Sequence, residues 1–342
     1  MVGKRKLAML LCTVLVGATL SGCGGTKTAT SESGSGANVA SSDVKNIGII
    51  QLVQHDALDS TNKGFVDALK EKGYEDGKNI KIEQQNAQGD MTNAQTIAKQ
   101  FADSKKDLIF AIATPTAQAV YNATKDIPTV FTAVTDPVAA DIAKDWKSSG
   151  TNLTGTSDKV PVEKQIELLK QLLPNAKTVG VIYNTSETNS VIQVDELKAA
   201  AEKAGLAVKE VGVTNVNEIN QNLVSALGEM DVLYTPTDNT VASGYALVGK
   251  LCLDKNVPII GAEEAVVTKG GLASIGIDYY KLGQEAGLKA VEILEGKKPS
   301  DIEITTLSEM SFTINTDVAK KLNITIPAEI EASAKKVTGG VE

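Results

Sequence analysis

KNIGII at residues 45–50 returns as KTVGVI at residues 177–182. Three more pairs follow in the same order along the chain: ATPT at 113–116 with YTPT at 234–237, DIPTV at 126–130 with NVPII at 256–260, and NLTGTSD at 152–158 with GLASIGID at 271–278. A single match of this kind would be weak. Four matches in one order indicate that the second half of the chain is a duplicate of the first, with loops of altered length.

Short apolar runs alternate with amphipathic stretches in each copy. In the first copy we expect strands at residues 46–53, 79–84, 108–113 and 128–133, and helices at 59–72, 91–104 and 116–124. Strict alternation of strand and helix predicts an α/β fold with a doubly wound parallel sheet and right-handed crossovers. About 300 residues exceed what one compact core usually supports, so the duplication predicts two such lobes.

The ends of the repeats suggest where the chain crosses between lobes. We expect crossings near residues 157–160, 276–279 and 305–310, which together make a multi-strand hinge. Lobe 1 is then residues 46–157 plus about 278–305, and lobe 2 is residues 158–277 plus about 306–330. Parallel sheets bind ligands beyond the carboxyl ends of their strands, so two facing lobes predict a cleft that closes on a ligand.

The N-terminus has the pattern of an export signal. Lys4, Arg5 and Lys6 precede an apolar run at 7–20, and LSGC at 20–23 resembles a bacterial lipobox. We expect residues 1–22 to be a signal peptide and Cys23 to carry lipid such as palmitate. Residues 23–45 would form a flexible tether to the outer face of the bacterial membrane. An ordinary signal peptide, with Cys23 incidental, is the alternative.

Composition excludes several classes of protein. The net charge of −8 without basic clusters argues against nucleic acid as a partner. Cys252 is the only cysteine expected in the folded part, so no disulfide framework is possible. One histidine and one cysteine cannot build a zinc site, and we predict neither metal nor cofactor.

Enzymatic motifs are mostly missing. STNK at 60–63 matches the S-x-x-K of penicillin-recognising enzymes, and TDN at 237–239 resembles their second motif, but no Lys-Thr-Gly follows. The chain has no nucleophile elbow, P-loop or His-Glu-x-x-His. We therefore predict no enzyme, while a mechanism that uses carboxylates alone remains open. A repressor is excluded because a signal peptide occupies the place of its DNA-binding motif, whereas a sensory lipoprotein remains an alternative.

Several runs resemble one known family. HDALD at 55–59, QNAQGD at 85–90, ATPTAQ at 113–118, VFTAVTDP at 130–137, Asn189-Ser190, PTDNTV at 236–241 and Asp278-Tyr279-Tyr280 look like the tryptophan/tyrosine-type substrate-binding proteins of ABC transporters. The likeness covers residues 46 to about 330. It implies a type I periplasmic-binding fold, an ABC permease as partner, and an aromatic or large apolar amino acid as ligand.

Two stretches depart from that family, and the ligand class therefore has competitors. Asp56 stands where proline is usual, and GAEE at 261–264 is a variable stretch; both lie near the expected cleft. Sugars and nucleosides are the alternative ligands. Sugar sites usually stack rings on aromatic side chains, and this chain is only 4% aromatic, with Trp146 as its single tryptophan.

Candidate ligand-binding residues lie where strands end and helices begin. Thr114 is expected to cap a helix with Pro115 in its first turn, and Thr114, Thr116 and Thr135 with helix N–H groups would bind a carboxylate. Asp238 would bind an α-ammonium group or only cap its helix. The full predicted set is Gln54, His55, Thr114, Thr116, Thr132, Thr135, Asp136, Asn189, Ser190, Thr237, Asp238, Asn239 and Asp278. Asn189 and Ser190 could equally be capping residues, and His55 could be a solvated loop residue.

Overall fold

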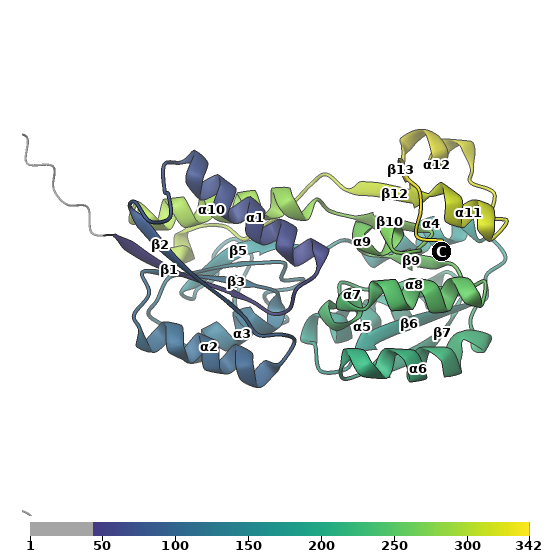
Figure 1. The fold of residues 1–342 in the computed structure, drawn as a ribbon, viewed down its shortest axis with the longest axis horizontal. Coiled ribbons are helices and arrows are strands. Elements are labelled where there is room, and N and C mark those ends of the chain that lie inside the picture. Colours follow the sequence, from purple (N-terminus) through teal and green to yellow (C-terminus); the bar gives the residue numbers. More distant parts are fainter. Residues whose placement is uncertain (1–43, 342) are drawn as a thin grey trace, which may run out of the picture. The chain divides into compact units, whose positions relative to one another are not determined.

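The computed structural model describes residues 44–341, and Figure 1 shows their fold. The predictions for residues 1–43, which include the signal peptide, Cys23 and nearly all of the tether, lie outside the described residues. Strands and helices alternate through most of the described chain. The predicted α/β class with two doubly wound lobes is confirmed.

The first sheet has six strands in the order β11-β5-β4-β3-β1-β2, and all of its pairs are parallel. Its strands are β1 (Lys45–Gln51), β2 (Ile80–Asn86), β3 (Leu108–Ile112), β4 (Thr129–Thr132), β5 (Leu153–Ser157) and β11 (Thr305–Thr306). The helices packed on it are α1 (Asp56–Glu71), α2 (Met91–Asp103), α3 (Thr114–Ala123) and α10 (Tyr279–Leu294). β3 is buried along its whole length, as expected for a central strand with helices on both faces.

The second sheet has seven strands in the order β13-β12-β10-β9-β8-β6-β7. They are β6 (Thr178–Asn184), β7 (Ala207–Val213), β8 (Val232–Thr235), β9 (Ile259–Gly261), β10 (Ala273–Gly276), β12 (Ser311–Asn315) and β13 (Lys335–Val337). Its helices are α4 (Val162–Leu172), α5 (Thr188–Lys203), α6 (Ile219–Ala226), α7 (Asn239–Ser243), α8 (Tyr245–Asp254), α9 (Glu264–Thr268), α11 (Thr316–Lys321) and α12 (Ala328–Ser333). We keep the sequence-based terms lobe 1 and lobe 2 for the parts built on the first and second sheets.

One strand pair departs from the predicted parallel pattern. β12 pairs antiparallel with β10, with Ala273 opposite Ile314 and Gly276 opposite Ser311. The chain reaches β12 directly from β11 of the first sheet, without the helix that would turn it parallel to its neighbour. The third crossing between the sheets therefore supplies an antiparallel strand.

Helices α1 and α10 of lobe 1 are in backbone contact (Figure 1). A Cβ atom added to Gly64 would lie 2.1 Å from the carbonyl oxygen of Tyr280, and one added to Gly283 would lie 2.0 Å from that of Thr61. Only glycine permits this approach. The contact fixes the start of α1, which follows His55, against the start of α10, which begins at Tyr279.

Two predicted helix starts were wrong. α1 begins at Asp56 rather than residue 59, because His55 is the extended residue that precedes the first turn. α3 begins at Thr114, and the N-cap position belongs to Ala113, whose φ is +88°. The predicted N-cap role of Thr114 is therefore wrong, because the sharp turn falls one residue earlier than the Thr-Pro pair suggested.

Candidate ligand-binding site

Buried polar side chains gather beyond the carboxyl ends of strands in both sheets. In lobe 1, Thr135 follows β4 and Asp158 follows β5. In lobe 2, Glu187 follows β6, Asp238 follows β8 and Glu263 follows β9. This is the edge at which open parallel sheets bind ligands.

Hydrogen bonds join the polar groups of the two lobes. The hydroxyls of Thr135 and Thr237 are 3.2 Å apart, and Gln193 donates to the Thr135 hydroxyl at 3.4 Å. The ring of His55 meets the Asn239 side chain, with 3.4 Å between Nε2 and Oδ1. The two sets of strand ends therefore face one shared buried site.

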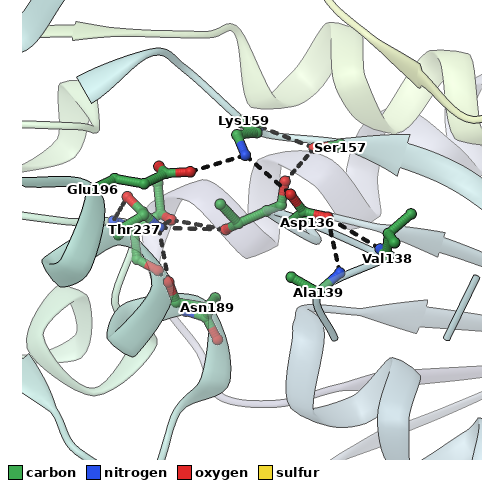
Figure 2. Close-up of polar contacts among 10 residues, drawn as sticks. Asp136, Val138, Ala139, Ser157, Lys159, Asn189, Glu196 and Thr237 are labelled. Carbon is green, nitrogen blue, oxygen red and sulfur yellow. Dashed lines mark hydrogen bonds and ion pairs between the residues drawn. The ribbon is translucent and has the colours of Figure 1, made fainter. Parts of the chain in front are cut away.

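A lysine at the first crossing bridges the lobes beside this site. Lys159 Nζ lies 3.0 Å from Asp136 of lobe 1 and 2.9 Å from Glu196 of α5 in lobe 2 (Figure 2). Burial alone would lower the pKa of Lys159, but its two carboxylate partners raise it above the ordinary value. Lys159 therefore stays charged and belongs to the hinge contacts.

Four carboxyl groups are buried at the site: Asp158, Glu187, Asp238 and Glu263 are each at most 4% exposed. Two of them are satisfied by the protein. Glu187 accepts from Asn189 and from the backbone and side chains of Asn239 and Thr240. Asp238 accepts from the Val241 amide at 2.8 Å and from the Asn184 amide and Ser190 hydroxyl at 2.6 Å.

The carboxyl groups of Asp158 and Glu263 are not fully hydrogen-bonded by the protein. Asp158 Oδ2 accepts from the Tyr279 hydroxyl at 3.0 Å, while Oδ1 has no hydrogen-bond partner among residues 44–341. Glu263 Oε2 likewise has none in the described chain, and the side chain makes no capping bond to α9. Because a buried acceptor without a donor costs free energy, the fold by itself does not explain why these two carboxyl groups are buried.

The pKa values of these groups reflect their burial. Burial raises the pKa of Asp158 to about 6, against the opposing effect of the Tyr279 hydroxyl. Burial and then the Glu187 charge raise the pKa of Asp238 to about 7. Burial and then the charges of Asp158, Asp238 and Glu187 raise the pKa of Glu263 well above its ordinary value. The site is therefore short of positive charge.

No lysine of the described residues forms an ion pair with these four carboxyl groups, since Lys159 beside the site pairs with Asp136 and Glu196 instead. Lys289 is the one buried lysine of residues 44–341, and its ammonium group donates to the Glu303 carbonyl oxygen. Burial lowers the pKa of His55 to about 4, so the imidazole is neutral at physiological pH. A cation that reached this site would be stabilised by Asp158 and Glu263.

The predicted threonines of lobe 1 have different surroundings. Thr114 is buried, and its hydroxyl has no partner in the part of the chain that the structure describes. Thr116 donates to the carbonyl oxygens of Ile112 and Ala113 at 2.7 and 2.8 Å, so its proton serves the helix start. The Thr132 hydroxyl pairs with that of Thr156 at 2.9 Å. Thr114 alone keeps a free donor.

The predicted residues of lobe 2 are all buried and form one network. Asn189 donates to the Thr237 carbonyl oxygen at 2.8 Å, and Ser190 donates to Asp238. Neither is the N-cap of α5, which is Glu187. Asp238 does cap α7, as the alternative reading of the sequence expected.

Three predicted residues lie outside the buried site. Gln54 is exposed, and Asp136 caps the turn at residues 136–139 through the amides of Val138 and Ala139 (Figure 2). Asp278 is exposed and caps α10; it lines an open groove of about 1070 Å³ between α1, α9 and residues 306–311. Their ligand roles remain predictions.

Five residues of the site were missing from the predicted set: Asp158, Glu187, Gln193, Glu263 and Tyr279. Asp158 had a signal, since it ends a repeated segment, and Glu263 lies in the stretch that departs from the family pattern. Glu187 and Gln193 look like ordinary polar helix residues. Only packing reveals that they are buried.

Cys252 is free and buried, and burial raises the pKa of its thiol to about 12. Between residues 44 and 341 no helix is long and apolar enough to cross a membrane. The same residues contain no cluster of His, Cys, Asp or Glu arranged for a metal ion.

Two doubly wound lobes that enclose a polar site at their strand ends define a type I periplasmic-binding protein. Distant solved substrate-binding proteins, 14% to 18% identical with TM-scores of 0.55 to 0.59, share this fold. A family model described as ABC transporter substrate binding protein matches residues 46–338. The chain belongs to this family, whose members bind a small-molecule substrate outside the cytoplasm for an ABC transporter.

Close relatives narrow the family. The chain is 49% identical to a tyrosine-binding protein of Clostridioides difficile (strain R20291), over 94% of this chain and 93% of that protein. It is 41% identical to a Streptococcus pneumonia ABC domain solved in complex with L-Trp, with a TM-score of 0.83 over 86% of this chain and 99% of that one. A ligand-free, open substrate-binding protein from Clostridium difficile is 52% identical but has a TM-score of only 0.66, over 86% and 99%. The structure of this chain is therefore more similar to the ligand-bound relative than to the open one.

Proposed function

We propose that this substrate-binding protein captures a free aromatic amino acid, tyrosine or tryptophan, for an ABC importer. The observation that carries the proposal is the pair of buried, incompletely bonded carboxyl groups of Asp158 and Glu263. An α-ammonium group has three donors and one positive charge, and two carboxylates whose charges act on each other can accept two of those donors. Two relatives that are more than 40% identical are named for tyrosine and for tryptophan, which supports the aromatic side chain.

The ligand carboxylate would lie against lobe 1. Thr114 offers a free buried hydroxyl in the first turn of α3, where backbone N–H groups lack intrahelical partners. Ala113 and Ala133, at the ends of neighbouring strands, have positive φ values of +88° and +52°. Strained backbone of this kind is often found at ligand sites, and here it supports a binding role for the edge of lobe 1.

Asp238 plays an indirect part in this proposal. Its oxygens accept three hydrogen bonds from the protein, so we assign the direct ammonium contacts to Asp158 and Glu263. The Asp238 charge still acts on Glu263 through space and favours a cationic ligand.

We also propose that the protein performs no chemistry and is held at the membrane by lipid on Cys23. Support for the anchor comes from the lipobox-like LSGC at 20–23 and the polar run that follows. Cys23→Ala should release the protein from membranes or block its processing. Mass spectrometry of the mature N-terminus decides this, because an unmodified terminus elsewhere would contradict the anchor.

The ligand proposal is tested by calorimetry on the mature chain with a small panel of compounds. L-Tyrosine and L-tryptophan should bind, while N-acetyl-L-tyrosine, which lacks the ammonium group, and tyramine, which lacks the carboxylate, should bind far more weakly. Glucose and adenosine should give no heat. A sugar or nucleoside that bound in place of the amino acids would overturn the proposal.

A further inference from the structure

His55 is buried but has few bonds to the protein around it. It precedes α1, is 9% exposed, and makes no side-chain bond to its own helix. Burial lowers the pKa of the ring to about 4, although Asn239, Asp59 and Asp56 oppose that change. The imidazole is therefore neutral, and one of its nitrogens carries hydrogen while the other offers a lone pair.

The hydrogen bonds around His55 determine which of its ring nitrogens carries the hydrogen atom. Glu187 Oε2 accepts a hydrogen bond from the side-chain nitrogen of Asn239. A carboxylate can only accept, so the Asn239 NH₂ group must point to Glu187 and its oxygen must point to His55. The Nε2 atom, 3.4 Å from that oxygen, must then be the N–H donor. The two hydrogen bonds that link His55 to Asn239 and Asn239 to Glu187 therefore leave the lone pair of the ring on Nδ1.

That lone pair has no donor. Nδ1 is buried and has no hydrogen-bond partner anywhere in residues 44–341. We propose that His55 Nδ1 accepts a hydrogen bond from the side chain of the bound ligand, either a phenol O–H or an indole N–H, and thereby selects tyrosine and tryptophan over phenylalanine. This inference rests on the proposed function and adds a specificity-determining residue to it.

A neutral acceptor suits a neutral donor better than it suits the ammonium group. The ammonium is already provided for by Asp158 and Glu263, whose charges bind a cation more strongly than imidazole does. A ligand without a side-chain donor would leave Nδ1 buried and unpaired, which corresponds to a loss of roughly 5- to 150-fold in affinity. Phenylalanine and 4-fluorophenylalanine are such ligands, and the second is close to tyrosine in size.

The first experiment compares L-tyrosine, L-phenylalanine and 4-fluoro-L-phenylalanine by calorimetry on the wild type and on His55→Leu. Leucine is similar to histidine in size and offers no acceptor in place of Nδ1; the bond to Asn239 is lost as well, which changes the affinity for all three ligands alike. The wild type should prefer tyrosine by roughly 5- to 150-fold. In His55→Leu this preference should fall to within about threefold. A preference for tyrosine that persisted in His55→Leu, or that was absent from the wild type, would overturn the proposal.

A second measurement needs no substitution. His55 is the only histidine in the chain, so its ring nitrogens give unambiguous ¹⁵N NMR signals. The complex with tyrosine should show the tautomer protonated at Nε2, and its Nδ1 signal should differ from that of the phenylalanine complex. The opposite tautomer, or the same Nδ1 signal in both complexes, would refute the assignment even if His55→Leu failed to fold. If none of the aromatic amino acids bound the wild type, the proposed function itself would fail, which is a different result from lost selectivity.

Discussion

The same tripeptide, Thr-Pro-Thr, follows a central strand in both lobes and gives two different structures. In lobe 1, Thr114 opens α3 directly after the positive-φ turn at Ala113. In lobe 2, Thr235 still belongs to β8, and the helix starts only at Asn239, with Asp238 as its cap. The first threonine hydroxyl of each copy lacks a partner among the described residues, but only that of Thr114 lies in a first helical turn. In lobe 2 a carboxylate, that of Asp238, caps the helix start. Duplicated sequence thus supplied two kinds of binding edge.

The two binding edges also differ in charge, because the carboxyl groups are concentrated in lobe 2. Three of the four buried carboxyl groups, Glu187, Asp238 and Glu263, belong to lobe 2, and the fourth, Asp158, stands at the crossing. Lobe 1 contributes hydroxyls and His55. An amino acid held across the lobes would therefore place its carboxylate on lobe 1 and its ammonium between Asp158, at the end of lobe 1, and Glu263 of lobe 2, so that neither lobe alone makes all of the contacts.

The largest loss of affinity is expected when the unpaired carboxyl group of lobe 2, that of Glu263, is removed. Glu263→Gln should weaken tyrosine binding by about 2–5 kcal/mol, because one side of a buried charged pair is lost. Stability without ligand should stay the same or rise, since a buried carboxyl group without a partner is removed. Calorimetry and thermal melts measure both. Glu264→Gln is the matched control: its oxygen pairs with Lys335 near the surface, so affinity should barely change. Equal effects of the two substitutions would contradict the assignment of the ammonium contact to Glu263.

The next effect is on pH dependence. The pKa values of about 6 for Asp158 and about 7 for Asp238 lie above the value of about 3.9 for an unfolded aspartate. From about pH 4 to 7 the ligand-free native chain therefore binds more protons than the unfolded chain. Its free energy of unfolding should fall as pH rises through this range, by up to about 1.4 kcal/mol per pH unit for each proton.

A bound ammonium group reverses this trend, because it favours the ionised form of Asp158. Tyrosine binding should release protons, and its affinity should rise between about pH 5 and pH 7 by up to about tenfold per unit for one proton. Calorimetry in buffers of different ionisation enthalpy measures the released protons. Affinity that stayed flat or fell with rising pH would mean that the buried carboxyl groups do not face the ligand cation.

The smallest effect concerns lobe 1. Thr114→Val should reduce tyrosine affinity by about 0.5–1.5 kcal/mol through loss of one hydrogen bond to the ligand carboxylate. Thr132→Val is its control, since the Thr132 hydroxyl pairs with Thr156 and its loss should lower the melting temperature without changing affinity. If Thr132→Val were the one that weakened binding, the assignment of the carboxylate to Thr114 would be wrong.

Sequence alone predicted what depends on local pattern and duplication. The repeated apolar runs at 45–50 and 177–182 became β1 and β6, each a central strand paired on both sides. The antiparallel β12 could not be predicted, because its direction depends on the route of the chain between sheets rather than on its own residues.

The site was only partly accessible from sequence for a similar reason. Thr114, His55 and Asp238 follow strands, and that position is visible in the pattern of the chain. Glu263 is one of 42 acidic residues, and nothing local distinguishes it from Glu264. Glu263 is buried because of the way α9 packs on the second sheet, whereas the adjacent Glu264 pairs with Lys335 near the surface.

The central claim is that Asp158 and Glu263 hold the ammonium group of a free amino acid, and a crystal structure of the complex with L-tyrosine tests it most directly. The account predicts the α-nitrogen within hydrogen-bonding distance of Asp158 Oδ1 and of a Glu263 carboxyl oxygen, with the ligand carboxylate at the start of α3. An α-nitrogen bound to Asp238 instead, or pointing to solvent while Asp158 and Glu263 stay unpaired, would contradict it.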